Sequence, residues 1–567
     1  MLLPDVLCGK RRWLMLFLLA NSVLQSLILI AIGLSNKLVF DSFMDTSKYT
    51  PSTHLLAVFT LLVVLGVVLA WLKHNEWVLY EKMGQSYIFE VRQRLFAHLT
   101  TLSRDTAQGR SKGVVMLRLM GDLNALRQWV SLGLTRLWTA SIALITTLIA
   151  LAIIQWMLAL TAAVVIVIGL LVFLPIGNRI RTTSQQARNY RARLATNLFE
   201  KIANIQVIQV FGQAEREQRR VSKQGNYLLD AMIERAKSIG LSRGANELTV
   251  ILATASVLFV GANVVMQGEA TPGTIVAAMS IIALLTPGLR DLGRVGEYWH
   301  NAVVSREQLN YFLSLPAELV DANKIIKLPA GGGCLQFNNC FAGNYLKSLT
   351  VTAPAGSRIA VVGPNGSGKS TLMLVLARLM PITQGSVMLD GVEMSSIALK
   401  QLRREVAIIS PDLGLLRGSI RYNLLYRNRK LSPKKLDSIL ELCDLRSFID
   451  SLEQGLDTRL TEGGRNLSVG QRQRLALARA LVDNPRLLLL DEVDSNLDPG
   501  FIQTLKNVIQ RFQGTVLLIT QRLEMVQLTD TVWHLYRGRL VEQGNTQELL
   551  KKISLTSVLF TGKHCIQ

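Results

Sequence analysis

The chain has 567 residues, of which 49% are hydrophobic and 18% are charged, and its mean hydropathy is +0.30. Its 62 basic residues against 40 acidic ones give a formal net charge of +22. A basic excess can serve nucleic acid or membrane lipid, but no basic patch with interleaved aromatic residues accompanies it, which argues against a nucleic-acid partner. The long apolar runs of the first half exclude an entirely soluble protein.

Six apolar stretches with almost no charge lie between residues 13 and 289. Each has about the length of a helix that crosses a bilayer core, roughly 17–25 residues, and a soluble domain does not hold six of them. The chain is therefore predicted to begin with an all-α membrane domain of six transmembrane helices. The predicted spans are Trp13–Leu34, Leu55–Leu72, Leu137–Ile154, Met157–Pro175, Glu247–Met266 and Thr274–Leu289.

Basic residues are distributed unevenly between the connections of these spans. Residues 73–136 hold 10 Lys and Arg and residues 179–243 hold 13, whereas the opposite connections hold only Lys37 and Lys48. Because cytoplasmic loops carry the excess of Lys and Arg, both termini are predicted to be cytoplasmic. The basic excess near the spans would also attract anionic membrane lipid.

Both long cytoplasmic stretches, Leu79–Leu99 and Ala187–Phe211, show helical spacing of apolar residues. We therefore expect the spanning helices to continue well into the cytoplasm. The residues that form the two patterns are Val91, Leu95 and Leu99 in the first stretch and Leu194, Leu198, Ile202 and Ile205 in the second.

A break in helical character separates the membrane domain from the rest of the chain. Pro316, Pro329 and the glycines of 331–333 would interrupt any helix, and a strand-like run begins at Leu335. The predicted organisation is a membrane domain at 1–312, a linker at 313–334 and a second domain at 335–567.

The cysteines do not indicate a disulfide or a metal site. All five fall in predicted cytoplasmic regions, where thiols stay reduced, and none has metal-ligand spacing with any of the six histidines. We expect them to be small buried or surface residues. They are Cys8, Cys334, Cys340, Cys443 and Cys565.

A glycine-rich loop in the second domain follows the apolar run Ile359–Val362 and fits the phosphate-binding pattern G-x-x-x-x-G-K-[ST]. Its glycines let backbone N–H groups turn toward a polyphosphate, Lys369 reaches the β- and γ-phosphates, and the Ser370 hydroxyl binds Mg²⁺. A helix beginning near Lys369 would point its positive end at the same anion. The loop residues are Gly363, Pro364, Asn365, Gly366, Ser367, Gly368, Lys369, Ser370 and Thr371.

Two acids end a second apolar run, Leu487–Leu490. Such a run is typical of a buried parallel strand, and nucleotides bind at the carboxyl ends of such strands. Asp491 would hold Mg²⁺ through its water shell, and Glu492 would polarise the attacking water. Together with Lys369 this predicts an α/β P-loop NTPase domain.

The stretch Asn466–Arg474 (NLSVGQRQR) lies between these motifs and resembles the LSGGQ signature of the ATP-binding cassette (ABC) family. Thr461–Gly464 and Ser495–Asp498 are similar to two further short loops of that family, so the resemblance covers residues 335–550. It implies that Ser468, Gly470 and Gln471 cover the γ-phosphate of ATP held by a second cassette. It also makes Tyr345 the candidate for stacking on adenine.

The resemblance implies an exporter-type half-transporter, which works as a dimer by alternating access coupled to ATP binding and hydrolysis. The partner would be a second copy of the chain or a related half-transporter, in a bacterial inner (plasma) membrane. Short coupling helices are expected near Gly121–Asn124 and within 206–220. Because most spans lack charged residues, we expect an amphipathic or lipidic substrate rather than a small ion.

Three positions depart from the family pattern. The metal- and water-sensing glutamine falls at Pro411, which has no amide donor or polar side chain, and the switch histidine falls at Gln521. Gln521 is the second catalytic candidate, because its amide still donates a hydrogen bond but cannot titrate. Val469 replaces a signature glycine. These changes leave an alternative open, a nucleotide-gated regulatory or degenerate partner subunit with little hydrolysis of its own.

Overall fold

The computed structural model describes residues 3–44, 52–102, 118–317, 326–494, 499–551 and 555–561. Its internal contacts divide the chain into two compact units, the first of which comprises Met1–Leu99 and Gln108–Leu315. The second comprises Pro316–Gln567 with Thr100–Ala107. The described part of the first unit is helical, and the second combines β-sheets with helices.

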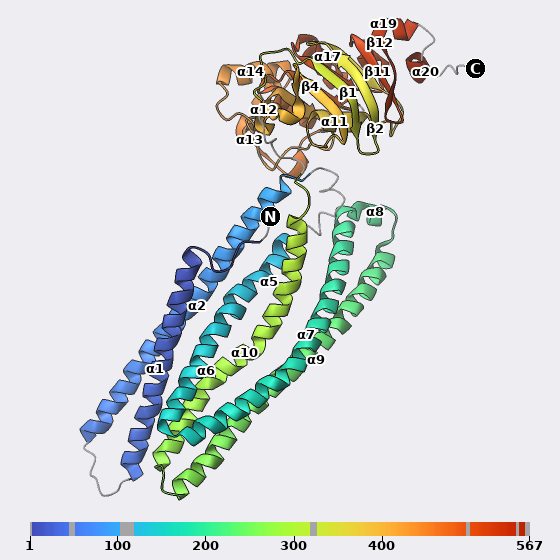
Figure 1. Ribbon diagram of the computed structural model, residues 1–567. Coiled ribbons are helices and arrows are strands. Elements are labelled where there is room, and N and C mark those ends of the chain that lie inside the picture. The colour runs from blue at the N-terminus through green and yellow to red at the C-terminus, as the bar shows by residue number, and fades with distance from the viewer. Residues whose placement is uncertain are drawn as a thin grey trace. The chain divides into compact units, whose positions relative to one another are not determined.

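The helical unit contains the six predicted spans, each within one long helix (Figure 1). These helices are α1 (Lys10–Met44), α2 (Ser52–Leu99), α6 (Thr135–Ile154), α7 (Trp156–Ala203), α9 (Ala214–Met266) and α10 (Pro272–Leu313). The short segments are η1 (Arg118–Asp122), α5 (Leu123–Gln128), η2 (Trp129–Leu134) and α8 (Ile205–Val210).

Four of the long helical segments are long and apolar enough to cross a membrane, and the described residues add two shorter apolar segments. The four are 10–41, 56–99, 120–154 and 214–266, and the two are 156–169 and 272–283. All six belong to the helices that contain the predicted spans, so the unit is that of a multi-pass membrane protein.

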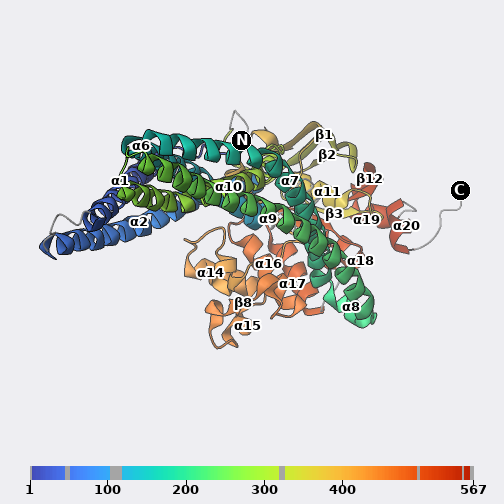
Figure 2. The ribbon, with the colours of Figure 1, turned by 90° about the horizontal axis from the view of Figure 1, so that it is seen from below.

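Three of these helices continue far beyond a membrane span. Helices α2 and α7 have 48 residues each and α9 has 53, whereas a span needs about 20. The predicted extensions are therefore confirmed, and α7 and α9 run side by side in both views (Figures 1 and 2). Val91 and Leu95 are buried as expected, but Ile202 and Ile205 are exposed in the single chain.

The short helix expected near Gly121–Asn124 stays a prediction, because residues 103–117, directly before this stretch, lie outside the described residues. Residues 121–124 belong to an uninterrupted helical run from Arg118 through η1, α5 and η2 to Ile154, and Gly121 adopts no positive φ that would end a helix there. The expected short helix within 206–220 corresponds to α8, which occupies Ile205–Val210 between α7 and α9.

The second unit is built on a six-stranded sheet with the order β12-β11-β3-β10-β9-β6, in which all strands but the edge strand β12 pair in parallel. A second sheet has the order β2-β1-β4-β5, and β7 pairs with β8. The strands are β1 (Leu335–Ala342), β2 (Leu346–Ala353), β3 (Arg358–Val362), β4 (Gln384–Leu389), β5 (Val392–Glu393), β6 (Val406–Ile409), β7 (Gly418–Ser419), β8 (Arg459–Leu460), β9 (Leu487–Asp491), β10 (Thr515–Ile519), β11 (Thr531–Tyr536) and β12 (Arg539–Asn545).

Helices and strands of this unit pack together in two large hydrophobic cores and a smaller one. Alternate residues of a strand point to opposite faces, so Leu487 and Leu489 enter one large core while Leu488 and Leu490 enter the other. This is the predicted α/β domain. Its helices are α11 (Lys369–Leu376), α12 (Leu399–Glu405), α13 (Ile420–Leu424), α14 (Pro433–Leu442), α15 (Arg446–Asp450), α16 (Val469–Leu481), α17 (Pro499–Arg511), α18 (Leu523–Val526), α19 (Thr546–Lys551) and α20 (Leu555–Thr561).

The cysteines provide a test of these cores. Cys340 and Cys443 are buried, whereas Cys8 is exposed and Cys334 is half-buried. Burial raises the pKa of Cys340 to about 11 and that of Cys443 to about 12, and only the thiolate reacts readily with maleimide. We expect native protein to be labelled at Cys8, with Cys340 and Cys443 still unlabelled when the pH is raised from about 7 to about 9.

Peptide mass mapping after labelling measures this, with denatured protein as the positive control for every thiol. Labelling of Cys443 in native protein as fast as Cys8 would contradict its place in the core.

Candidate functional site

The carboxyl ends of three neighbouring strands bring the predicted site residues together. In the parallel register, Val361 of β3 is level with Ile519 of β10, and Ile519 is level with Asp491 of β9. The glycine-rich loop after β3, the acids at the end of β9 and the segment after β10 therefore meet at one edge of the sheet. The fourth strand of this edge, β6, ends at Ile409, immediately before Ser410 and Pro411.

The loop from Gly363 to Gly368 needs glycine at both ends. Gly363 has φ +143°, and a Cβ there would lie 2.1 Å from the carbonyl oxygen of Leu535. Gly368 has φ +100°, and its Cβ would lie 2.6 Å from the carbonyl oxygen of Tyr345. Both positions combine a left-handed backbone with close backbone neighbours, which only glycine tolerates. The loop then leads directly into α11 at Lys369.

The ammonium group of Lys369 is held inside this loop. It donates hydrogen bonds to the carbonyl oxygens of Gly363, at 2.8 Å, and of Pro364, at 2.9 Å. The residue is buried, and burial lowers the pKa of the ammonium group against the attraction of Glu492 and Asp491. A buried ammonium group at a helix start, with carboxylates nearby, is suited to a polyphosphate.

Asp491 links the loop to two hydroxyl groups. Ser370 donates to one carboxylate oxygen of Asp491 at 3.2 Å, and Ser410 donates to the other at 3.4 Å. Burial of this carboxyl raises its pKa, with repulsion from Glu492 and Asp412 adding to the effect and the two hydroxyls opposing it. Ser410 is a site residue that the sequence analysis missed, although it directly precedes Pro411.

Hard oxygen ligands of this kind suit Mg²⁺, which is commonly held by one or two carboxylates and substrate phosphates. Among the described residues no group of three or more His, Cys, Asp or Glu side chains could hold a metal ion by itself. Asp491 and Ser370 would therefore hold the ion together with a bound nucleotide.

Glu492 follows Asp491 with a strained backbone. Its φ of +48° is unusual for a residue other than glycine, and its amide donates to the carbonyl oxygen of Ile519 at 3.1 Å. This bond fixes the start of the turn after β9, beside the end of β10. Strained backbone of this kind clusters at functional sites.

A buried aspartate connects the same turn to the segment after β10. Asp494 accepts a hydrogen bond from the Thr520 hydroxyl, which in turn accepts one from the Arg522 amide at 3.0 Å. Asp494 is 2% exposed, and burial raises the pKa of its carboxyl. The two hydrogen bonds hold the backbone on both sides of Gln521. Sequence reasoning missed Asp494 because it belongs to no motif considered there.

Gln521 reaches across to the glycine-rich loop. Its side-chain nitrogen donates to the Asn365 side-chain oxygen at 3.4 Å. The predicted switch residue therefore lies beside the phosphate loop, and Asn365 has a contact that its motif alone did not reveal. The bond is long, so it can be exchanged for a contact to a bound phosphate.

Other predicted residues have different surroundings. Tyr345 is 56% exposed at the start of β2, with its backbone against Gly368. Its role in stacking on adenine stays a prediction. Asp412 lies near Asp491, as its repulsion shows, whereas the loop Ser495–Asp498 lies outside the described residues.

The signature residues lie apart from this edge. Ser468 caps α16, accepting from the Gln471 amide at 3.2 Å, while its own amide donates to the Gln471 side chain at 2.9 Å. This reciprocal pair is a capping box. Ser468 is exposed, a Cβ at Gly470 would meet nothing within 4 Å, and Val469 is 48% exposed. No hydrogen bond joins these residues to the phosphate loop in the described part of the chain.

Two family models match the chain. The model described as "ABC transporter transmembrane region" matches residues 15–288, and the model described as "ABC transporter" matches residues 346–495. Together they cover most of both units and support the resemblance found in the motifs.

Curated relatives match nearly the full length. The chain is 26% identical to the ATP-dependent lipid A-core flippase of Syntrophus aciditrophicus over 94% of this chain and 89% of that protein. It is 27% identical to the uncharacterized ABC transporter ATP-binding protein YknV of Bacillus subtilis over 83% of this chain and 79% of that protein. The solved structure of a bacterial Atm1-family ABC exporter with ATP bound has the same fold, with a TM-score of 0.87, 24% identity and coverage of 98% and 99%.

The first prediction for the site concerns Lys369. We expect Lys369→Ala to weaken ATP binding by about tenfold or more, because a charge-assisted hydrogen bond contributes about 1.5–3 kcal/mol. Isothermal titration with a non-hydrolysable ATP analogue measures this. Lys434→Ala, at an exposed lysine at the start of α14, serves as the control and should bind normally. Unchanged affinity in Lys369→Ala would show that the phosphate loop is assigned wrongly.

The second concerns Gln521. We expect Gln521→His to raise the ATP turnover rate severalfold. The gain should stay below the ~10²–10⁴-fold of full general acid–base catalysis, because this residue orients the attacking water and does not transfer a proton. Histidine places a donor on a rigid ring where glutamine now bonds Asn365. Phosphate release by purified protein in lipid measures turnover, and Gln521→Ala should lower it. A rate in Gln521→His at or below that of the unchanged chain would indicate a loop adapted to glutamine.

Proposed function

The chain belongs to the ABC transporter family, and we propose that two copies of it form an exporter that moves an amphipathic lipid across a bacterial inner membrane. The chain is an ATP-binding half-transporter of the exporter type, an ATPase coupled to transport. We further propose that Mg²⁺ binds with ATP, that the site residues have the roles given below, and that both termini are cytoplasmic.

The exposed signature loop carries the proposal of a second copy. Among the described residues, Ser468 and Gly470 form no hydrogen bond with the phosphate loop of their own chain, yet they begin a helix whose N-terminal amides suit a phosphate. In the ABC family a complete ATP site needs a phosphate loop and a signature loop, so the phosphate loop of one chain forms only half of it. Two identical chains related by a two-fold axis would supply each site with both halves.

Helix α8 supports the same arrangement. It has no buried residue, and its apolar side chains Val207 and Val210 are 53% and 80% exposed, as is Phe211 at 70%. A soluble monomer rarely leaves such a group of large apolar side chains uncovered. At the end of the long α7 and α9 extensions, α8 is the natural contact to a second copy.

In this arrangement each group of the site has one role. Lys369 holds the β- and γ-phosphates, and Ser370 and Asp491 hold Mg²⁺, which neutralises charge on the phosphates when bound. Glu492 polarises the attacking water, and Gln521 keeps it in place. Ser468 and Gly470 of one copy close the site of the other, and closure switches the helices from inward- to outward-facing.

The substrate is argued from the spans and the relatives. Polar side chains in the first span donate to backbone carbonyls of the helices: Asn21 to Leu72 at 3.1 Å and Ser26 to Ser22 at 2.9 Å. Such satisfied groups are poor ligands for a polar solute. Relatives named lipid A-core flippases act on a lipid. An amphipathic lipid therefore fits the chain best, with both termini cytoplasmic by the distribution of basic residues.

The alternative of a nucleotide switch with vestigial hydrolysis is not favoured. Glu492 is present, and Ser410 places a polar side chain at Asp491 where Pro411 offers none. The relatives are named as ATP-dependent transporters.

A complementation experiment tests the proposed second copy. Lys369→Ala disables the phosphate loop and Ser468→Arg disables the signature, so either chain alone should lose nearly all ATP turnover. When the two variants are co-expressed and purified as a mixed pair through different tags, one site combines an intact loop with an intact signature. We expect turnover to recover to roughly half of the unchanged dimer, since one of its two sites is restored.

Pairs of the same variant carrying both tags are the control for copurification. A mixed pair no more active than these controls would contradict sites shared between chains. Absence of turnover in the unchanged chain would instead support the nucleotide switch.

A further inference from the structure

Five arginines surround one cavity in the membrane unit. The cavity has a volume of about 520 Å³ and lies between α5, α7, α9 and α10. The only carboxylate among its described lining residues is that of Glu297. The arginines are Arg188 and Arg191 on α7, Arg235 and Arg243 on α9, and Arg294 on α10.

Two of these arginines are held in place by the protein itself. Arg188 pairs with Asp122 at 3.4 Å and donates to the Ser305 hydroxyl at 2.8 Å, and Arg235 pairs with Glu297 at 2.6 Å. Burial, with repulsion from Arg191 and Arg235, lowers the pKa of the Arg188 guanidinium. The Asp122 carboxylate opposes this lowering.

The remaining charge is not neutralised. Arg191 contacts only the Met232 sulfur, at 3.6 Å, and within the described residues Arg243 and Arg294 form no hydrogen bond or ion pair. Arg294 lies in electrostatic range of Asp291, but that carboxylate is paired with Arg136 at 2.6 Å. Three exposed guanidinium groups therefore line this polar space without an ion pair among the described residues, and Arg243 and Arg294 also line a smaller cavity of about 80 Å³ with Glu247 and Glu297.

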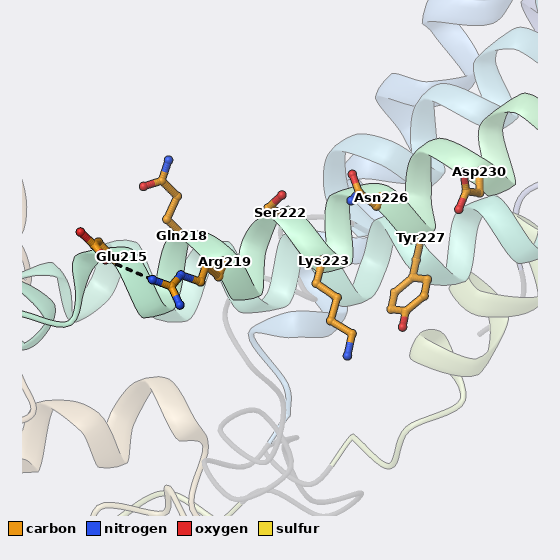
Figure 3. Close-up of a pocket in the computed structure, with 8 residues that line it drawn as sticks. All are labelled: Glu215, Gln218, Arg219, Ser222, Lys223, Asn226, Tyr227 and Asp230. Carbon is orange, nitrogen blue, oxygen red and sulfur yellow. Dashed lines mark hydrogen bonds and ion pairs between the residues drawn. The ribbon is translucent and has the colours of Figure 1, made fainter.

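Two other spaces of this unit lack such an excess. A second cavity of about 340 Å³, between α1, α2, α6 and α10, balances two basic against two acidic residues. A groove along α9 is balanced too, with Arg219 and Lys223 against Glu215 and Asp230, and Arg219 pairs with Glu215 (Figure 3). The general basicity of the chain does not explain why only one of these three spaces is cationic.

Arginine is the side chain best suited to fill such a space with a phosphate. Its guanidinium remains charged and offers a planar set of N–H donors that match phosphate oxygens in pairs. Arg243 lies four residues before the fifth predicted span and Arg294 five residues after the sixth. The two unpaired arginines are thus at headgroup depth, where a phosphate would sit while attached chains enter the apolar region.

We propose that the arginine cavity binds the phosphate-bearing end of the transported substrate, with Arg243 and Arg294 as its direct ligands. The inference rests on the proposed transport function and specifies the substrate as a phosphate-bearing anion. Arg188 and Arg235, fixed by their own ion pairs, would form the cationic wall behind it. The phosphate can belong to a lipid headgroup or to a soluble organic phosphate, because the recognising chemistry is the same.

Charge variants with opposite expected effects test the proposal. We expect Arg243→Gln with Arg294→Gln to weaken binding of phosphatidic acid by about tenfold or more, because two charge-assisted contacts are lost. Glu297→Gln should strengthen it severalfold, because it removes the one lining carboxylate and frees Arg235. A structural role for these residues would weaken binding in both variants. The matched control, Arg219→Gln with Lys223→Gln, removes the same charge from the balanced groove on α9 and should bind normally.

The probe is the full chain in nanodiscs of phosphatidylcholine with or without phosphatidic acid, and native mass spectrometry counts the bound phosphatidic acid. Glycerol 3-phosphate is added as a soluble competitor. Failure to compete identifies a lipid headgroup, and effective competition identifies a soluble organic phosphate. Equal binding in all variants, or equal loss in the cavity and groove variants, would overturn the inference.

Basal ATP hydrolysis by the unchanged chain is measured in phosphatidylcholine alone. If it is present while the variants bind phosphatidic acid equally, the transporter stands and the arginine cavity is not its phosphate site. If it is absent, the proposed function fails, whatever binds to the cavity.

Discussion

Parallel pairing of β3, β10 and β9 is the constraint on which the nucleotide site depends. Because Val361, Ile519 and Asp491 are level in the sheet, the loops that follow these strands must share one edge. A shift of one residue would turn the leucines of β9 to the opposite cores and move Asp491 away from Ser370. The burial of these strands on both faces therefore fixes a site in which the contacts of Asp491 and Gln521, at 3.2–3.4 Å, are long.

That edge is complete only on the side of its own chain. Lys369 lies between loop carbonyls, Asp491 joins two hydroxyls, and Gln521 contacts Asn365, yet the signature on α16 has no role there. The side chains of Ser468 and Gln471 form a capping box within α16. The start of this helix is therefore ordered without a ligand. The exposed helix start and the phosphate loop are the two surfaces that the proposed second copy would bring together.

The features predicted correctly from the sequence are those encoded by residues that are contiguous in the chain. The phosphate loop, the acids after β9 and the six apolar spans each depend on local spacing, and all of these segments have the predicted secondary structure. The features that were missed depend on contacts between distant segments. Ser410 is ordinary until β6 places it at Asp491, and Asp494 is significant only because β10 brings Thr520 to it. The short helix expected near Gly121–Asn124 stays a prediction: the described residues from Arg118 to Ile154 form one helical run, and 103–117 lie outside them.

The arginine cavity illustrates the same limit in the membrane unit. Its cations come from three helices, and the first and last, Arg188 and Arg294, are 106 residues apart in the sequence. Four of them were counted only within the basic excess of residues 179–243, and Arg294 lies outside that stretch. In space, two of them are neutralised by Asp122 and Glu297, and three are not. Guanidinium groups without an ion pair that line one space repel each other, and a bound anion would relieve that repulsion. Each unit of the chain thus has positive charge for which we propose a phosphate ligand. In the cassette this charge is that of Lys369, and in the membrane unit it is that of Arg243 and Arg294.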